Sequence, residues 1–267
     1  MDDRILQEKD AEIERIRAEL FLLREHFNEE LERQKLDALA EFAAGAGHEI
    51  NNPLAIIGGH AQLLLREIEN TEHRRQLAVI TAQVKRAYEM IADIRYFARP
   101  PKPEIEQFDL VKWLQSLVEK QMPLMREFGI ELHFETDSDS AVIETDPVQL
   151  HLVVSALCNN ACDILQTTGS NIWLRFRRME KGWEISVEDD GPGVSQEIRP
   201  LIFCPYYSGR QAGRGLGFGL PKAWRIMQQL GGSIKYEPSK TGGAKFVVQL
   251  NPHTHTACAN HSLTPNQ

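Results

Sequence analysis

A run of prolines divides the chain into two parts that no single helix can span. Residues 99–103 read Arg-Pro-Pro-Lys-Pro, and a proline inside a helix removes a backbone hydrogen bond and clashes with the preceding turn. The apolar pattern before this run repeats at helical spacing, whereas the pattern after it mixes helices with strands. We therefore predict an extended linker over residues 99–108 that separates two domains. The chain of 267 residues is long enough for both.

The first segment of the chain carries an apolar stripe on a highly charged helix. Its apolar residues recur at steps of three or four, at Ile13, Ile16, Leu20, Leu23, Phe27 and Leu31. This spacing is a heptad seam, and a helix with one narrow seam buries it only against another helix. We predict that residues 1–35 form a coiled coil with a second copy of the chain. The alternative is a single helix that lies on its own domain.

Residues 36–98 are predicted to form an antiparallel helical hairpin. The first helix runs to about Ile68 and crosses the step Asn51-Asn52-Pro53, where the proline predicts a kink. A polar loop leads into a second helix, whose apolar face carries Leu77, Ile80, Val84, Ala87, Ile91, Ile94 and Phe97. Two such hairpins pack into a four-helix bundle. We therefore predict a homodimer.

Charge and hydropathy exclude several classes of protein. The formal net charge is −8, and residues 1–41 hold thirteen acidic and seven basic side chains. No basic cluster stands out, so we expect no nucleic-acid partner. No apolar run approaches the ~20 residues of a membrane-spanning helix, and the N-terminus lacks the pattern of a signal peptide. We expect no membrane segment and a cytoplasmic location.

Residues 109–251 are predicted to form one α+β domain. Helices are expected near 110–127, 147–166 and 220–230, and strands near 130–136, 141–144, 171–178, 182–189, 232–237 and 244–250. Helices and hairpin-connected strands without strict alternation favour one sheet with helices on one face. The polar residues 252–267 are predicted to be a disordered tail.

A histidine in the first helix of the hairpin has neighbours that favour a chemical role. Small residues precede His48, Glu49 follows it, and Asn52 lies one turn further on the same face. A carboxylate beside an imidazole can fix the tautomer of the ring and raise the nucleophilicity of the other nitrogen. The small residues would let another domain approach. The alternative is an ordinary surface histidine.

Two glycine-rich clusters lie in the second domain. The segment 189–193 reads Asp-Asp-Gly-Pro-Gly at the end of a predicted strand, and glycines alternate over 213–219 before a predicted helix. Alternating glycines before a helix let backbone N–H groups surround a phosphate. The cluster is neither a P-loop nor a convincing Rossmann fingerprint. The alternatives are an acidic turn and a flexible hinge without a ligand.

Together these clusters resemble, in type and order, the sensor histidine kinases of two-component signalling. The resemblance covers the chain from about residue 36 to 250. The matching segments are the H box at 48–53, the N box helix at 146–161, the G1 box at 189–193, the F box at 203–207, the G2 box at 215–220 and the last glycine-containing strand at 242–246. The family implies a HisKA-type dimerisation and phosphoacceptor hairpin, then a GHKL-type ATPase domain. The expected fold is thus a coiled coil, a dimeric four-helix bundle and a two-layer α+β sandwich of the Bergerat type.

The resemblance implies ATP and Mg²⁺ as ligands and suggests a role for each matching residue. Asp189 would accept a hydrogen bond from the adenine amino group, and Asn160 would hold Mg²⁺. Gly191 and Gly193 would allow close backbone approach, and the glycines that would wrap the phosphates are Gly215, Gly217 and Gly219.

One position departs from the family pattern. The family usually has a second asparagine four residues before the metal-binding one, and here that place is Ala156. Asp163, one turn after Asn160, is expected to substitute in part through water. Arg210 and Arg214 are candidates to neutralise the γ-phosphate, and the alternative is that both are merely solvated.

The chemistry of the family implies an autokinase. His48 would be the nucleophile through Nε2, Glu49 would orient Nδ1–H and accept its proton, and the linker would be the joint that brings the ATPase domain to the bundle. The phosphoryl group would then pass to an aspartate in the receiver domain of a separate response regulator. We expect the stimulus to arrive through the coiled coil, through a partner protein, or not at all.

Two questions of activity stay open at this point. Asn52 would aim a water at the aspartyl phosphate of the regulator as a phosphatase, or it would only satisfy backbone groups that Pro53 frees. A pseudokinase scaffold, which Ala156 favours, is the first rival to the autokinase. Another ATPase of the same superfamily, such as a chaperone or topoisomerase relative, is the second, and His48 in its H box argues against it.

Overall fold

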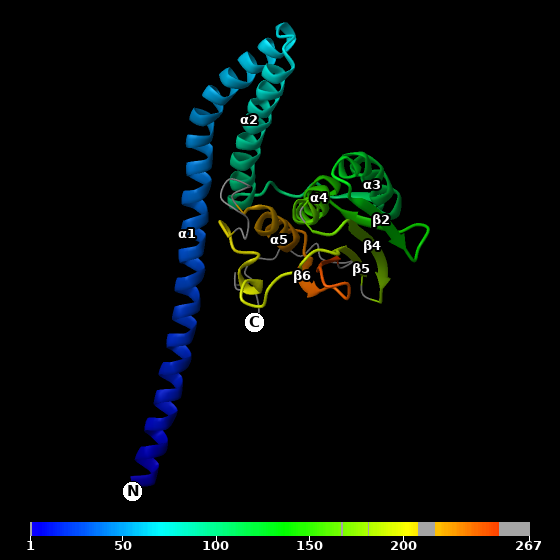
Figure 1. Ribbon diagram of the computed structural model, residues 1–267. Coiled ribbons are helices and arrows are strands. Elements are labelled where there is room, and N and C mark those ends of the chain that lie inside the picture. The colour runs from blue at the N-terminus through cyan, green and yellow to red at the C-terminus, as the bar shows by residue number, and fades with distance from the viewer. Residues whose placement is uncertain (1, 167, 181, 208–216, 251–267) are drawn as a thin grey trace.

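The computed structural model describes residues 2–166, 168–180, 182–207 and 217–250. Figure 1 shows a long helical hairpin with an α/β domain beside it. Helix α1 (Asp2–Glu67) is one continuous helix of 66 residues, and helix α2 (Thr71–Ala98) returns along it. Asn70 is the N-cap of α2, where its Oδ1 atom accepts a hydrogen bond from the backbone N–H of His73 at 3.0 Å. The predicted coiled-coil segment and the first helix of the hairpin are thus parts of one helix.

The hairpin is closely packed around its small residues. A Cβ atom on Gly47 would lie 3.0 Å from Cγ2 of Ile91, so α2 approaches α1 closely at this glycine, and a larger residue would need Ile91 to shift. A Cβ atom on Gly45 would meet nothing within 4 Å. Gly47 therefore allows the two helices of the hairpin to pack closely, whereas Gly45 leaves open space beside α1. Pro53 lies inside α1, and Figure 1 shows α1 bending in its light-blue part.

The α/β domain is built on a five-stranded sheet with the order β2-β4-β5-β7-β6. Strands β2 and β4 are parallel, and the other neighbours are antiparallel. The strands are β2 (Glu131–Thr136), β4 (Asn171–Met179), β5 (Gly182–Asp189), β6 (Ser233–Pro238) and β7 (Ala244–Leu250), and the helices are α3 (Leu110–Glu127), α4 (Pro147–Leu165), the 3-10 helix η1 (Arg199–Leu201) and α5 (Gly219–Gln229).

The helices α3, α4 and α5 lie on one face of this sheet (Figure 1). The core between the two layers includes Leu114, Leu150, Leu157, Ile172, Leu174, Phe176, Ile185 and Ile226. These side chains come from alternate positions of the strands and from the inner faces of the helices, which is the arrangement that buries an apolar stripe on each element. The predicted fold class, helices followed by a two-layer α+β domain, is confirmed.

A second, smaller sheet lies partly where the sequence predicted only linker. Strand β1 (Glu106–Asp109) pairs antiparallel with strand β3 (Val142–Thr145). The extended segment is therefore shorter than the predicted range 99–108. Strand β1 is four residues long and holds one large apolar side chain, Phe108, so an alternating pattern has no room to show.

The remaining linker is fastened to the α/β domain. The carbonyl oxygen of Pro101 accepts hydrogen bonds from Nε2 of Gln149 at 2.9 Å and Nε2 of Gln229 at 2.8 Å. The backbone N–H of Glu104 donates to Oδ2 of Asp146 at 2.8 Å. The linker is thus held by α4 and α5, and a joint between the domains has only the residues from the end of α2 to Pro101 in which to bend.

In the described part of the chain, one helix is long and apolar enough to span a membrane, and it is α4. Its buried residues are Gln149, Leu150, Val153, Val154, Leu157, Cys158, Ala161 and Leu165. These residues belong to the core described above or border it, so the position of α4 in the core explains its composition.

Candidate active site

The carboxylate of Asp189 is buried at the end of strand β5. Asp189 is 2% exposed, and its Oδ1 atom accepts hydrogen bonds from the backbone N–H groups of Gly191 at 3.0 Å and Ala244 at 3.2 Å. Burial raises the pKa of this carboxyl above its ordinary value, although the two backbone donors oppose the shift. A carboxylate held by one oxygen in a buried place is suited to accept a directional hydrogen bond from a ligand.

Glycines pack backbone against backbone around this carboxylate. A Cβ atom on Gly243 would lie 1.9 Å from the backbone oxygen of Asp189, and one on Gly193 would lie 2.8 Å from the backbone oxygen of Gly242. Gly193 also has a φ of +71°, which glycine adopts without strain. Gly193 therefore packs closely against the loop before β7, and the close approach to a ligand that the resemblance implies for Gly193 stays a prediction.

Asp190 has a different environment from its neighbour. Its Oδ1 atom accepts hydrogen bonds from the backbone N–H groups of Ser170 and Asn171, both at 2.9 Å, and Oδ2 accepts one from Nδ2 of Asn171 at 2.8 Å. Burial opposes ionisation here, but these donors outweigh it and lower the pKa of Asp190. Asp190 therefore fixes the start of β4, whereas Asp189 is the candidate ligand-binding group.

A cavity of about 480 Å³ lies in front of these loops. It is lined by Asn160 and Asp163 of α4, by Gly193, and by Gly217 and Gly219 at the start of α5. The volume suits a small-molecule ligand, and a helix N-terminus favours a phosphate. Amide and carboxylate oxygens are ligands that Mg²⁺ prefers. The residues therefore fit a nucleotide with its metal ion.

Asp189 and Gly191 are not among the residues that line this cavity, but Gly191 adjoins one of them. A Cβ atom on Gly191 would lie 3.1 Å from Cγ2 of Ile164, and Ile164 lines the cavity. The apolar part of the wall is completed by Val194, Ile198, Ile202 and Phe246. Apolar walls beside a buried carboxylate are suited to a flat base that carries an amino group.

Helix α2 closes the other side of the cavity, which the sequence did not predict. Arg86, Glu89, Met90 and Asp93 line it, at spacings that place them on one face of the helix. Asp93 forms an ion pair with Lys222 of α5. Further along the same face, the ring of Phe97 packs edge-on against Phe218, with the ring centroids 5.5 Å apart.

The candidate phosphoacceptor lies on the surface of α1. His48, Glu49 and Asn52 are all exposed, and within the described residues no hydrogen bond joins Glu49 to His48. Gly47 faces Ile91, and the Tyr88 hydroxyl donates to the backbone oxygen of Asn51 at 3.0 Å. These contacts place His48 at the level of residues 88–91 of α2. His48 thus lies at the level of the cavity residues Glu89 and Met90 along the hairpin, but it does not line the cavity.

Three of the predicted site residues lie outside the residues that the structure describes. They are Arg210, Arg214 and Gly215. The predicted tail 252–267 also lies outside the described residues.

Two protein-family models match the chain. Residues 38–102 match the His Kinase A (phospho-acceptor) domain, and residues 145–254 match the histidine kinase-, DNA gyrase B- and HSP90-like ATPase family. The chain therefore combines a phosphoacceptor hairpin with an ATPase domain. It belongs to the sensor histidine kinases of two-component systems.

The curated relatives that match the chain include named histidine and sensor protein kinases. The chain is 27% identical to the signal transduction histidine-protein kinase AtoS of Escherichia coli over 225 residues, which are 82% of this chain and 36% of AtoS. It is 31% identical to the sensor protein kinase PilS of Pseudomonas aeruginosa over 226 residues, which are 82% of this chain and 42% of PilS. The chain thus spans less than half the length of either relative.

Solved structures of histidine kinases have the same fold. Full-length ShkA in complex with AMPPNP matches with a TM-score of 0.67 at 25% identity, covering 79% of this chain and 45% of that one. ThkA in complex with the response regulator protein TrrA matches with a TM-score of 0.62 at 24% identity, covering 86% of this chain and 66% of that one.

Proposed function

We propose that this chain is an ATP-dependent protein histidine autokinase (EC 2.7.13.3) that phosphorylates His48 and passes the phosphoryl group to an aspartate of a separate response regulator. The observation that carries the proposal is the position of the cavity. Glu89 and Met90 of α2 line it, and Gly47, the residue before His48, packs against Ile91 of the same helix. A nucleotide in the cavity and the phosphoacceptor therefore lie beside the same turns of α2.

The transfer needs in-line positioning and neutralised charge more than covalent help from the protein. Nε2 of His48 attacks the γ-phosphorus of ATP, the Nε2–P bond forms, and the bond from phosphorus to the bridging oxygen breaks as ADP leaves. Glu49, next in the chain, accepts the proton from Nδ1. Asn160 with Asp163 would hold Mg²⁺, which supplies positive charge to the phosphate oxygens.

Incubation with γ-labelled ATP and Mg²⁺ tests the proposal against its two rivals. An autokinase acquires a label on the protein that is stable in alkali and lost in acid, as a phosphoramidate should be. A pseudokinase scaffold binds ATP and acquires no label. An ATPase of another kind releases labelled inorganic phosphate while the protein stays unlabelled.

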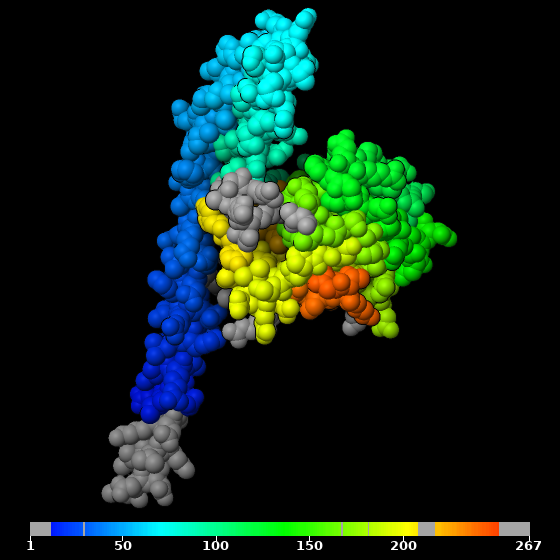
Figure 2. Space-filling view, in the orientation of Figure 1, coloured from blue at the N-terminus to red at the C-terminus, as the bar shows by residue number. Residues whose placement is uncertain are grey.

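We further propose that the chain is a homodimer. The predicted seam of α1 is exposed along its whole length, at Ile13, Ile16, Leu20, Leu23, Phe27 and Leu31, and Figure 2 shows this blue part of α1 projecting as an arm beyond the α/β domain. The hairpin exposes a second set of apolar residues, which includes Phe42, Ile50, Ile56, Ile57, Leu63, Leu64, Val79 and Ile80. Apolar surface of this extent is typical of an interface.

Removal of residues 1–35 is therefore expected to leave a dimer and to change the rate of self-labelling. The dimer persists because the hairpin keeps its own exposed apolar residues, and the rate changes because the long helix no longer sets the geometry of the bundle. Light scattering at micromolar concentration gives the molar masses of the full-length chain and of the shortened one. A monomeric mass for the full-length chain contradicts the homodimer.

A phosphatase activity is the finer part of the proposal and rests on Asn52. This residue is exposed one turn after His48 on α1, so its amide is able to hold a water and aim it at the aspartyl phosphate of a docked regulator. A response-regulator partner is supported by ThkA, a chain of the same fold that is in complex with TrrA.

Asn52→Ala is expected to keep self-labelling at His48 near the wild-type rate and to slow dephosphorylation of the regulator by tenfold or more. The regulator is phosphorylated first, separated from ATP and then mixed with each kinase. If Asn52 instead supports the backbone next to Pro53, both activities fall together.

A further inference from the structure

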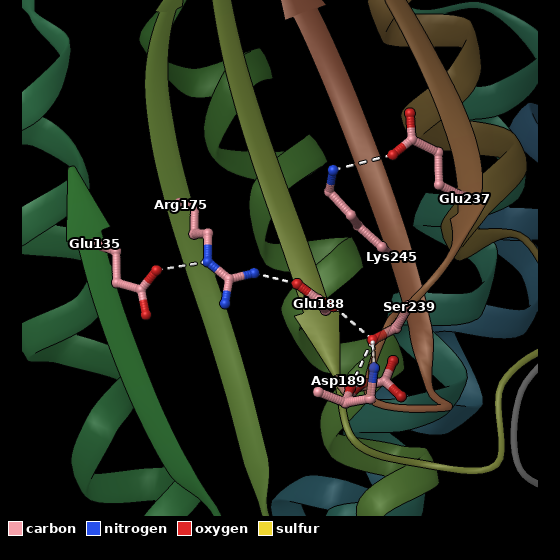
Figure 3. Close-up of polar contacts among 8 residues, drawn as sticks. Glu135, Arg175, Glu188, Asp189, Glu237, Ser239 and Lys245 are labelled. Carbon is pink, nitrogen blue, oxygen red and sulfur yellow. Dashed lines mark hydrogen bonds and ion pairs between the residues drawn. The ribbon is translucent and has the colours of Figure 1, made fainter. Parts of the chain in front are cut away.

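Glu188 and Asp189 are neighbours at the end of β5 and point to opposite faces of the sheet. Asp189 faces the helices and the cavity wall, and Glu188 faces away from them. Glu188 is nevertheless only 7% exposed. Its carboxylate forms an ion pair with Arg175 of β4, and Arg175 in turn bonds Oε2 of Glu135 on β2 at 2.6 Å. Figure 3 shows this series of side chains crossing three strands.

The other oxygen of Glu188 holds the turn between β6 and β7. Oε1 of Glu188 accepts a hydrogen bond from the hydroxyl of Ser239 (Figure 3). The Ser239 oxygen in turn accepts one from the backbone N–H of Thr241 at 3.0 Å. The backbone N–H of Ser239 donates to the oxygen of Gly243 at 3.1 Å. Burial opposes the ionised form of Glu188. The hydrogen bonds from Ser239 and Arg175 outweigh burial, so the pKa of Glu188 is lowered overall.

This turn returns to Asp189. The Thr241 hydroxyl donates to the backbone oxygen of Asp189 at 3.3 Å, and the backbone N–H of Ala244 donates to its Oδ1 atom at 3.2 Å. Gly243 lies so close to the backbone of Asp189 that no Cβ atom fits. The turn therefore holds the backbone of Asp189 through Thr241 and Gly243, and Ala244 after it holds the carboxylate. Both contacts set the direction of the Asp189 side chain.

We propose that Glu188, acting through the hydroxyl of Ser239 and the turn 239–243, is a positioning residue that orients Asp189 for recognition of the amino group of adenine. Glu188 does not touch the nucleotide. It acts from the far face of the sheet, and it makes the preference for an amino-substituted purine depend on residues outside the cavity. The inference rests on the proposed role of Asp189 in binding ATP.

Two nucleotides separate this role from a merely structural one. ATP carries the 6-amino group, and purine riboside triphosphate lacks it but keeps the ring, the sugar and the phosphates. The full chain and its variants are titrated with each nucleotide by calorimetry in the presence of Mg²⁺. Glu188→Gln and Ser239→Ala are expected to weaken ATP roughly tenfold, as for the loss of one well-oriented hydrogen bond. Both variants are expected to bind purine riboside triphosphate as the wild type does.

Two control variants test whether the effect depends on the Ser239 hydroxyl and not on any change in this part of the sheet. Ser239→Thr keeps the hydroxyl and is expected to restore the preference for ATP. Glu237→Gln removes the ion pair with Lys245, which lies on the same hairpin (Figure 3), and is expected to change neither affinity. Ser239→Ala decides the question if Glu188→Gln does not fold, because it leaves the Arg175 ion pair in place.

The outcomes keep the inference distinct from the proposed function. Equal affinities of the wild type for the two nucleotides refute the adenine role of Asp189 itself. A wild type that prefers ATP, together with variants that keep the same preference, refutes the positioning role of Glu188. Equal weakening of both nucleotides in the variants also refutes it, because general damage to the domain does not distinguish the two bases.

Discussion

Replacement of His48 with glutamine is expected to abolish self-labelling from γ-labelled ATP. Glutamine keeps a polar side chain of similar reach and continues a helix well, but its amide is not a nucleophile. His48 is exposed and does not line the cavity, so the fold and the affinity for ATP should stay as in the wild type. The loss should be complete, because one atom, Nε2, forms the bond to phosphorus.

The matched control is another exposed histidine of the same helix. His60 lies further along α1, and its side chain is also exposed, so His60→Gln makes the same chemical change at the same kind of surface. This variant is expected to label at the wild-type rate. Undiminished labelling of His48→Gln, or loss of the label from both variants alike, contradicts the assignment of His48 as the phosphoacceptor.

Elements with a strong pattern were predictable from the sequence. Helix α3 was expected at 110–127 and is Leu110–Glu127, and the last strand was expected at 244–250 and is Ala244–Leu250. Both have a clear apolar period and a defined end, such as Asp109, which caps α3. Strand β1 has no such period, because its four residues hold one large apolar side chain, and it is recognised only by its pairing with β3.

The contacts between the two parts of the chain were not predictable in the same way. The ion pair of Asp93 with Lys222 and the packing of Phe97 on Phe218 join residues more than a hundred positions apart. The sequence pattern around each residue predicts only its local secondary structure. It does not show which of many distant residues a charge or an aromatic ring will contact. Only the fold shows that this face of α2 becomes a wall of the nucleotide cavity.

The resemblance to the family assigned the adenine role to Asp189, but the residue pattern itself does not distinguish the two adjacent aspartates of the G1 box. Both follow β5, and both are carboxylates beside glycines. Their roles differ because the strand ends between them: Asp189 keeps the alternation of β5 and faces the helix layer, whereas Asp190 turns back to the start of β4 at Asn171. The pKa of Asp189 is accordingly shifted up and that of Asp190 is shifted down.

This difference predicts opposite effects of the same substitution at the two positions. The pKa of Asp189 is raised on folding, so its ionised form lowers the free energy of unfolding as pH rises above the ordinary value for an aspartate. The pKa of Asp190 is lowered, so its ionised form stabilises the fold at pH values above the ordinary pKa of an aspartate. This stabilisation is lost as pH falls through the lowered pKa.

At neutral pH, Asp189→Asn should leave the free energy of unfolding unchanged or raise it slightly. Asp190→Asn should lower it by about 1–3 kcal/mol, because an amide nitrogen would face Nδ2 of Asn171.

The affinity for ATP should respond in the reverse order. In Asp189→Asn, the remaining oxygen is the acceptor for Gly191 and Ala244, so the new NH₂ group takes the place that would face the amino group of adenine. Two donors then oppose each other in a buried site, and ATP binding should weaken on the order of a hundredfold. Asp190→Asn should bind ATP nearly as the wild type does, because both carboxylate oxygens of Asp190 are already bonded to Ser170 and Asn171 at the start of β4. Calorimetry gives the affinities and urea titration gives the free energies of unfolding, and an Asp189→Asn chain that binds ATP normally would remove the basis for its role in recognising the base.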